Sequence, residues 1–420
     1  MSGDGDPAAK LERLVEGYER DMKARPPVAD AEEPAEAPPS ALAPHANRLT
    51  SLDPTLAEMA AAASGDASAT ATPVPAAAES MPATAPVPAA PVREPADGRA
   101  VATWPAPAEV PAAAVPVPAV PAVPAVPSAP ADPEDLETWW SRGERVPLQA
   151  GARTWQIFVR TLGDGPALTA IHGFPTSSWD WEPVSRSLRH THRILAPDLL
   201  GFGDSDKPRA HDWSAFEQAD LIESLWRREG VTETRILAHD VGLTVALELL
   251  ARQEEGRLAA RMTDLTLLNG GVYAGFHRPR RIQVLLQQPV IGPLIARLLS
   301  EGSFGKAFAE IFGPEHQPSA ADLHQHWLSV ARRQGSRNYH RLIRYIPERR
   351  AHAPRWEDAL EATKTPIRFV WGMADPVSGA HMAEVVRQRR PGADLVELAG
   401  VGHYPQLEAP ERVIEAVENR

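Results

Sequence analysis

The sequence predicts an α/β fold: a mostly parallel sheet with helices on both faces and a helical cap inserted between two strands. Three observations predict it. Short apolar runs alternate with longer helical patterns from residue 134 onward, helix-forming residues interrupt this alternation at 270–361, and the first 133 residues differ in composition. Alternating strands and helices favour parallel pairing, because each crossover helix covers a face of the sheet.

The N-terminal segment, residues 1–133, contains 25 of the 43 prolines and is rich in alanine. Proline interrupts helices and central strands, and the segment has too few large apolar side chains to offset the entropy of ordering. We therefore predict a disordered arm. Residues 8–24 within it have the apolar spacing of a short helix. The arm is a candidate docking segment for a protein partner.

Charge is distributed unevenly along the chain. The arm carries 18 Asp/Glu and 8 Lys/Arg, a net charge of −10, whereas the whole chain carries −12. The remainder is therefore nearly neutral. Residues 134–420 have no cluster of basic residues that would predict binding to nucleic acid or to an anionic membrane.

Several further classes of protein are disfavoured. The chain has no cysteine, which excludes disulfides and thiol catalysis. We find no zinc-type ligand cluster and no glycine-rich phosphate loop, so we expect no metal and no cofactor. The first residues lack the layout of a secretory signal, and no apolar run of about 18 residues predicts a membrane span. We expect a cytoplasmic protein.

The strands are expected within seven apolar stretches, and an amphipathic helix is expected at 213–230, ending at a glycine. The stretches are residues 154–162, 167–174, 192–201, 234–242, 263–271, 366–375 and 393–403. We assign residues 134–269 and 362–420 to the two parts of the core and residues 270–361 to the cap. Substrate is then expected between cap and core, at the carboxyl ends of the strands.

A polar residue between small neighbours stands where a strand meets a helix. In Ala238–Gly242, Asp240 follows an apolar run and precedes the helical stretch LTVALELLAR. A strained turn of this kind needs small flanking residues and exposes its central side chain, which is the geometry of a nucleophile elbow. The alternative is that Asp240 is only the N-cap of the helix.

Two other loops supply partners for such a nucleophile. The backbone N–H groups of Phe174, after His172 and Gly173, and of Val241 are predicted to form an oxyanion hole. His172 itself is expected to be structural. His403 follows the last predicted strand as a candidate base, and Asp375 follows the preceding strand as the acid that orients it. The order nucleophile, acid, histidine suits this fold.

Taken together, these stretches resemble the α/β-hydrolase superfamily, in its epoxide hydrolase and haloalkane dehalogenase branch. The resemblance is strongest to the mesoderm-specific transcript hydrolase group. The matching stretches are HGFPTSSWDW (172–181), DLLGFGDSDKPR (198–209), AHDVG (238–242), LNGGVY with HRP downstream, and GHYPQLEAP (402–410). They span nearly all of residues 136–420 and imply an α/β-hydrolase fold.

The resemblance implies a two-step hydrolysis of a small apolar substrate. Asp240 attacks an electrophilic carbon and forms an alkyl ester. His403, held by Asp375, then activates a water that hydrolyses the ester. An aspartate suits attack on saturated carbon, as in an epoxide or an alkyl halide. Ordinary ester cleavage is disfavoured, because it would produce a reactive anhydride.

The departures from the family concern the leaving group. Haloalkane dehalogenases commonly have a tryptophan after the nucleophile, where this chain has Val241. Epoxide hydrolases usually place two cap tyrosines over the epoxide oxygen as acids. Tyr345 resembles the second of them, and the candidates for the first are Tyr339, for which we favour core packing, and Tyr273. We expect an epoxide hydrolase-like enzyme, with a dehalogenase or a non-catalytic ligand-binding protein as alternatives.

Two smaller expectations complete the site. Asn269 could orient the histidine from an alternative position, but we favour a role in capping the turn with Gly270 and Gly271. The basic runs at residues 278–281 and 348–350 are expected to form the solvated surface of the cap.

Overall fold

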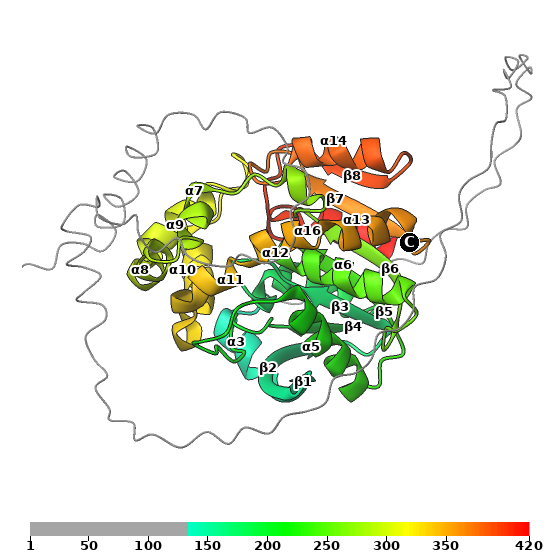
Figure 1. Ribbon diagram of the computed structural model, residues 1–420, viewed down its shortest axis with the longest axis horizontal. Helices are drawn as coiled ribbons and strands as arrows, with labels where there is room; N and C mark the ends of the chain where they lie inside the picture. Colours follow the sequence, from blue (N-terminus) through cyan, green and yellow to red (C-terminus); the bar gives the residue numbers. More distant parts are fainter. Residues whose placement is uncertain (1–132, 420) are drawn as a thin grey trace, which may run out of the picture. The chain divides into compact units, whose positions relative to one another are not determined.

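The computed structural model describes residues 133–419 (Figure 1). The predicted arm and its helix at residues 8–24 lie outside the described residues, apart from Pro133. The strands are β1 (Glu144–Ala150), β2 (Arg153–Leu162), β3 (Ala167–Ile171), β4 (Arg193–Pro197), β5 (Glu233–His239), β6 (Arg261–Leu268), β7 (Ile367–Gly372) and β8 (Asp394–Leu398).

The strands form a single eight-stranded sheet in the order β1-β2-β4-β3-β5-β6-β7-β8. β2 pairs antiparallel with β1 and with β4, and the remaining pairs are parallel. The predicted α/β fold is therefore confirmed, and all seven predicted strands are present. β1 was not predicted, and its antiparallel hairpin with β2 forms one lateral edge of the sheet.

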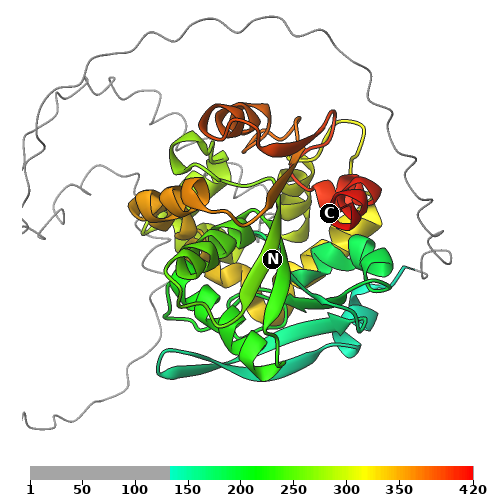
Figure 2. The same cartoon turned by 90° about the vertical axis from the view of Figure 1, so that its right-hand side faces the viewer.

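Helices outside the β6–β7 connection flank the sheet. They are α3 (Leu136–Ser141), η1 (Ser178–Trp181), α4 (Glu182–Leu188), α5 (Ala215–Arg228), α6 (Val241–Glu254), α14 (Ala380–Arg389), α15 (Pro405–Glu408) and α16 (Pro410–Glu418). Successive residues of β5 face opposite sides. Ile236 joins the apolar cluster beneath α5 and α6, and Leu237 joins the cluster beneath α4 and α16. Figure 2 shows helices on both sides of the twisted sheet.

The connection between β6 and β7 is helical throughout its regular elements. These are η2 (Ala274–Phe276), α7 (Arg281–Leu286), α8 (Ile291–Leu298), α9 (Glu301–Ala309), α10 (Ala320–Ala331), η3 (Arg332–Asn338), α11 (Tyr339–Leu342), α12 (Tyr345–Ala351) and α13 (Ala353–Ala362). Helices α7 to α11 gather to one side of the sheet (Figure 1). The boundaries 270 and 361 of the cap stay a prediction.

The last of these helices is tied to the core. The indole N–H of Trp356 on α13 donates to Glu248 of α6 at 2.9 Å, and Arg355 pairs with the same carboxylate at 2.8 Å. Glu248 is fully buried. A buried carboxylate needs such partners because desolvation alone would make it costly. The path from α12 to α13 is thereby fixed against α6, the helix that follows Asp240.

Candidate active site

Asp240 occupies the sharp turn between β5 and α6. Its φ of 45° and ψ of −105° are rarely adopted by residues with a side chain and cost roughly 1–3 kcal/mol. A Cβ atom added at Gly242 would lie 2.2 Å from the carbonyl oxygen of Ile171, and one at Gly173 would lie 2.8 Å from the Cβ of Asp240. The side chain makes no capping hydrogen bond to α6, so the turn has the geometry of an elbow.

A backbone donor already contacts the carboxylate of Asp240. The N–H of Phe174 donates to Oδ2 at 3.1 Å. Val241 is the first residue of α6, so its N–H has no acceptor inside the helix and lies at the positive end of the helix dipole. His172 is structural: Nε2 accepts from the N–H of Leu199 at 2.9 Å, and Nδ1 donates to the carbonyl of Gly173 at 2.8 Å.

The histidine and the second carboxylate meet beyond the ends of β7 and β8. Nδ1 of His403 lies 2.8 Å from Oδ2 of Asp375, and both side chains are buried. Asp375 also accepts hydrogen bonds from the N–H of Val377 and from the hydroxyl of Ser378, each at 2.7 Å. Because these donors fix the carboxylate, the ring of His403 is oriented with Nε2 as the nitrogen that can exchange a proton with water.

Asn269 does not have the predicted role of capping the turn with Gly270 and Gly271. Its side-chain amide donates to Oδ2 of Asp375 and to the carbonyl of Gly372, each at 2.9 Å, and accepts from the N–H of Gly372 at 2.6 Å. It therefore ties the end of β6 to the end of β7 and holds the acid that contacts His403. The favoured turn-capping role was wrong.

The pKa values of Asp240, Asp375 and His403 depend on one another's charge. Burial lowers the pKa of His403, but the Asp375 carboxylate and then Asp240 outweigh it and raise the pKa to about 9. Burial raises the pKa of Asp240, and the charges of His403 and Arg349 oppose that rise. Against the effect of burial, His403 and several donors hold the pKa of Asp375 well below its usual range. His403 is thus cationic at neutral pH beside two carboxylates.

The candidate tyrosines differ in what their hydroxyl groups do. Tyr339 and Tyr345 both pack against Phe174, with ring centroids 5.0 and 5.9 Å away. The hydroxyl of Tyr339 donates to the carbonyl of Pro175 at 2.6 Å. The hydroxyl of Tyr345 accepts from the side-chain amide of Gln283 at 3.2 Å, which leaves its proton available. Tyr273 interacts instead with charges on α13 and α14.

Arg349 is a site residue that the sequence analysis missed, because the run 348–350 was expected to be solvated. Its side chain, on α12, is 3% exposed. Nε and Nη2 donate to the hydroxyl of Thr244 at 2.8 and 2.5 Å, and Nη2 lies 3.4 Å from the carbonyl oxygen of Asp240. A Cβ atom at Gly271 would lie 1.9 Å from Nη1. The glycine therefore makes room for this guanidinium.

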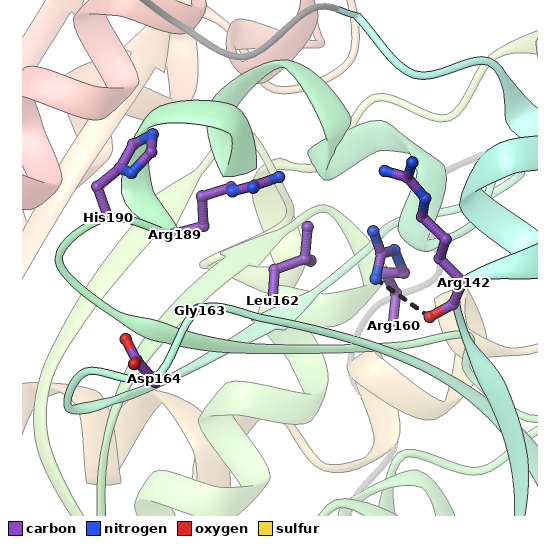
Figure 3. Close-up of a pocket in the computed structure, with 7 residues that line it drawn as sticks. All are labelled: Arg142, Arg160, Leu162, Gly163, Asp164, Arg189 and His190. Carbon is purple, nitrogen blue, oxygen red and sulfur yellow. Dashed lines mark hydrogen bonds between the residues drawn. The ribbon is translucent and has the colours of Figure 1, made fainter. Parts of the chain in front are cut away.

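A separate pocket of about 480 Å³ lies at the end of the sheet where the parallel strands begin, opposite the end that carries Asp240 (Figure 3). Gly163 and Asp164 on its rim precede β3, and Arg189 and His190 precede β4. Asp240, in contrast, follows β5. Because parallel strands begin at one end of the sheet and finish at the other, this pocket is distant from Asp240. The described residues contain no group of three metal-ligating side chains and no helix able to cross a membrane.

Comparisons with known proteins agree with this architecture. LipZ of Mycobacterium tuberculosis is 40% identical over 66% of this chain and 95% of its own length. The mesoderm-specific transcript homolog protein of Homo sapiens is 37% identical over 67% of this chain and 86% of its own. A solved α/β hydrolase fold protein from Burkholderia ambifaria has a TM-score of 0.54 and 26% identity, covering 66% of this chain and all of that one.

A haloalkane dehalogenase from Bradyrhizobium elkani, with a TM-score of 0.55 and 21% identity over 66% of this chain and 97% of its own, is similar in fold. The model of the alpha/beta hydrolase family matches residues 170–416. These matches confirm the resemblance that the sequence motifs indicate. The chain belongs to the alpha/beta hydrolase family.

Proposed function

We propose that this hydrolase uses Asp240 as its nucleophile, forms a covalent alkyl ester, and acts on a small organic epoxide. The observation that carries the proposal is the position of the Asp240 carboxylate. It stands on a strained elbow with the N–H of Phe174 on one oxygen, within electrostatic range of the cationic His403. A serine hydrolase has a hydroxyl at this position, whereas a carboxylate attacks saturated carbon.

In the first step, an oxygen of Asp240 attacks a ring carbon and the ring C–O bond breaks. The departing oxygen takes a proton from the hydroxyl of Tyr345, which donates to no protein group in the described structure. The proton of the cationic His403 then passes through solvent to the Tyr345 phenolate. In the second step, Nε2 of the neutral His403 takes a proton from water, and the hydroxide attacks the carboxyl carbon of the Asp240 ester. The N–H groups of Phe174 and Val241 stabilise the oxyanion. Collapse expels the diol oxygen, which takes the carboxyl proton, and this restores the Asp240 carboxylate beside a His403 that is cationic again.

The electrostatics explain how a histidine with a pKa of about 9 becomes a base. The charge of Asp240 contributes to that raised value. Once Asp240 is esterified it is neutral, and its contribution is lost. The pKa of His403 then falls toward neutrality, where a general base is most effective. Ester formation itself therefore prepares the histidine for the second step.

Isotope labelling in a single turnover tests the ester. With enzyme in excess over a styrene oxide probe in ¹⁸O-water, we expect the label in the side chain of Asp240 and not in the first diol released. The reason is that water attacks the carboxyl carbon, so the diol takes its new oxygen from Asp240. Peptide mass spectrometry locates the label. Label in the first diol with none in Asp240 would exclude the ester and favour direct attack by water.

The tyrosines give a second prediction. Tyr345→Phe is expected to reduce the rate of Asp240 alkylation by an epoxide by about 10²-fold or more, because the departing oxygen loses its acid. Tyr339→Phe is expected to change this rate much less, because its hydroxyl is engaged by Pro175. Stopped-flow single-turnover measurements give both rates. The assignment of Tyr345 is wrong if the two variants are affected equally.

Arg349 gives a third prediction, in the pH dependence of alkylation. Arg349 lowers the pKa of the buried Asp240 carboxyl. Its removal in Arg349→Met should therefore raise that pKa. In a plot of alkylation rate against pH, the acidic limb should then move to higher pH. Arg349→Lys should keep the limb near its original position, because it keeps the charge. Thr244→Val removes the neutral hydrogen-bond partner and serves as control. An unchanged limb in Arg349→Met would contradict this role.

A further inference from the structure

A second, larger cavity lies between the core and the β6–β7 connection. It has a volume of about 770 Å³ and is lined by Trp155 and residues 206–209 on the core side, and by parts of α8, η3 and α11 on the other. It is separate from the Asp240 site. Asn338 and His340 line the cavity, but Tyr339 between them reaches Pro175 beside the oxyanion hole. The short helix α11 thus divides the two sites.

The lining is strongly basic, although the whole chain has a net charge of −12. Its cationic side chains are Arg209, Arg297, Arg333, Arg337 and Arg341. Among the described residues that line it, Asp206 is the single carboxylate. Arg145, which is not part of the lining, already pairs with Asp206 at 2.5 Å. Arg341 pairs with Asp212, outside the lining, at 3.1 Å. The excess of positive charge in the cavity therefore lies on the other four arginines.

Three of the arginines that line the cavity form no ion pair with the described residues. In the part of the chain that the structure describes, no carboxylate oxygen lies within 4.0 Å of Arg209, Arg297 or Arg333. Arg337 donates to the neutral amide oxygen of Gln334 at 3.0 Å. Repulsion among the like charges of the cavity is reduced when an anion binds between them. The arrangement therefore favours the binding of an anion.

The backbone shapes both walls of the cavity. Nζ of Lys207 donates to the carbonyls of Phe202, Gly203 and Ser205, and burial lowers its pKa to about 7, so this lysine adds little to the charge of the cavity. On the opposite wall, Arg333 and Gln334 have φ values of 51° and 61°, a left-handed conformation that is uncommon for residues with a side chain. This turn ends α10 and brings residues 333–337 to the cavity.

We propose that this cavity binds a phosphate-bearing anion. A phosphate presents several charged oxygens at once, and guanidinium groups bind them in pairs of parallel hydrogen bonds. The volume also lies within the range of roughly 300–1,000 Å³ that is common for small-molecule sites. The phosphate could belong to a soluble metabolite or to a lipid headgroup, since the recognising chemistry is shared. The inference does not depend on the reaction at Asp240.

The test compares the full-length protein with two variants. The double variant Arg297→Glu/Arg333→Glu reverses two exposed charges of the cavity, one on each of α8 and η3. Arg228→Glu makes the same kind of change at the exposed end of α5, outside the cavity, and is the control. Isothermal titration calorimetry with inorganic pyrophosphate, at an ionic strength near 0.15 M, gives the affinity of each. Sedimentation with phosphatidylcholine vesicles, with and without phosphatidic acid, tests the lipid source.

We expect pyrophosphate to bind the wild type and Arg228→Glu with similar affinity, and the double variant at least about tenfold more weakly. Binding of pyrophosphate without vesicle binding supports a soluble phosphate ligand. Additional binding to the phosphatidic acid vesicles, lost in the double variant, supports a lipid headgroup. The proposal is overturned if neither probe binds, or if the double variant binds as the wild type does while its thermal unfolding is unchanged.

Discussion

His403→Gln incubated with an epoxide is expected to accumulate as a covalent adduct, heavier than the protein by the mass of the whole epoxide. Glutamine leaves alkylation by Asp240 possible but cannot take a proton from water. Loss of a general base slows the hydrolytic step by about 10²–10⁴-fold, so the ester should persist through intact-protein mass spectrometry. The wild type should show little adduct, because its ester is hydrolysed.

The mass of the adduct also distinguishes the substrate classes. An alkyl halide that reacts by displacement would add only its alkyl group, and such an adduct would identify a dehalogenase. Val241 offers no side-chain N–H to a departing halide, which is why an epoxide is favoured. If a folded His403→Gln protein formed no adduct with any member of a broad panel of epoxides and halides, a ligand-binding role would gain support.

Asp240→Asn is expected to abolish both the adduct and turnover, with a loss of about 10⁴-fold or more. An amide is a poor nucleophile, and no other carboxylate stands on the elbow. Asparagine has nearly the same shape, so the turn at Gly242 should be preserved. The double variant Asp240→Asn/His403→Gln, measured by the same mass spectrometry, should also lack the adduct.

Thermal unfolding of Asp240→Asn shows whether the fold survives the change. A folded variant that still hydrolyses substrate at the wild-type rate would show that another group attacks. A variant that loses turnover but still gains the mass of the epoxide would place the covalent bond on a different residue.

Much of the core could be predicted because local patterns specify it. The apolar runs of β3, β5 and β7 are short and bounded by turns. The loops that follow them carry Phe174, Asp240 and Asp375 of the proposed site. The elbow at Asp240 needs small neighbours, which the sequence displays directly. β1 was missed because its stretch contains Pro147, and a proline weakens a strand pattern even where buried and exposed residues alternate.

The supporting residues could not be predicted, because their roles depend on contacts distant in sequence. Asn269 contacts Asp375, which belongs to the other part of the core. Arg349 stands in a run of charges that looks solvated, and its burial depends on how α12 packs over Thr244 and Gly271. The choice between Tyr339 and Tyr345 depends on single hydrogen bonds that no periodicity reveals.

The pairing of β6 with β7 has a consequence for how the protein becomes active as it is made. Leu265 pairs with Ile367, about a hundred residues later, and closing so long a loop is an entropic cost that slows assembly. During synthesis Asp240 leaves the ribosome well before His403, by on the order of 10 to 30 s at ordinary elongation rates. Until β7 and β8 join the sheet, the nascent chain holds the proposed nucleophile without its proposed base, and β6 is an open edge that a chaperone or another chain can contact.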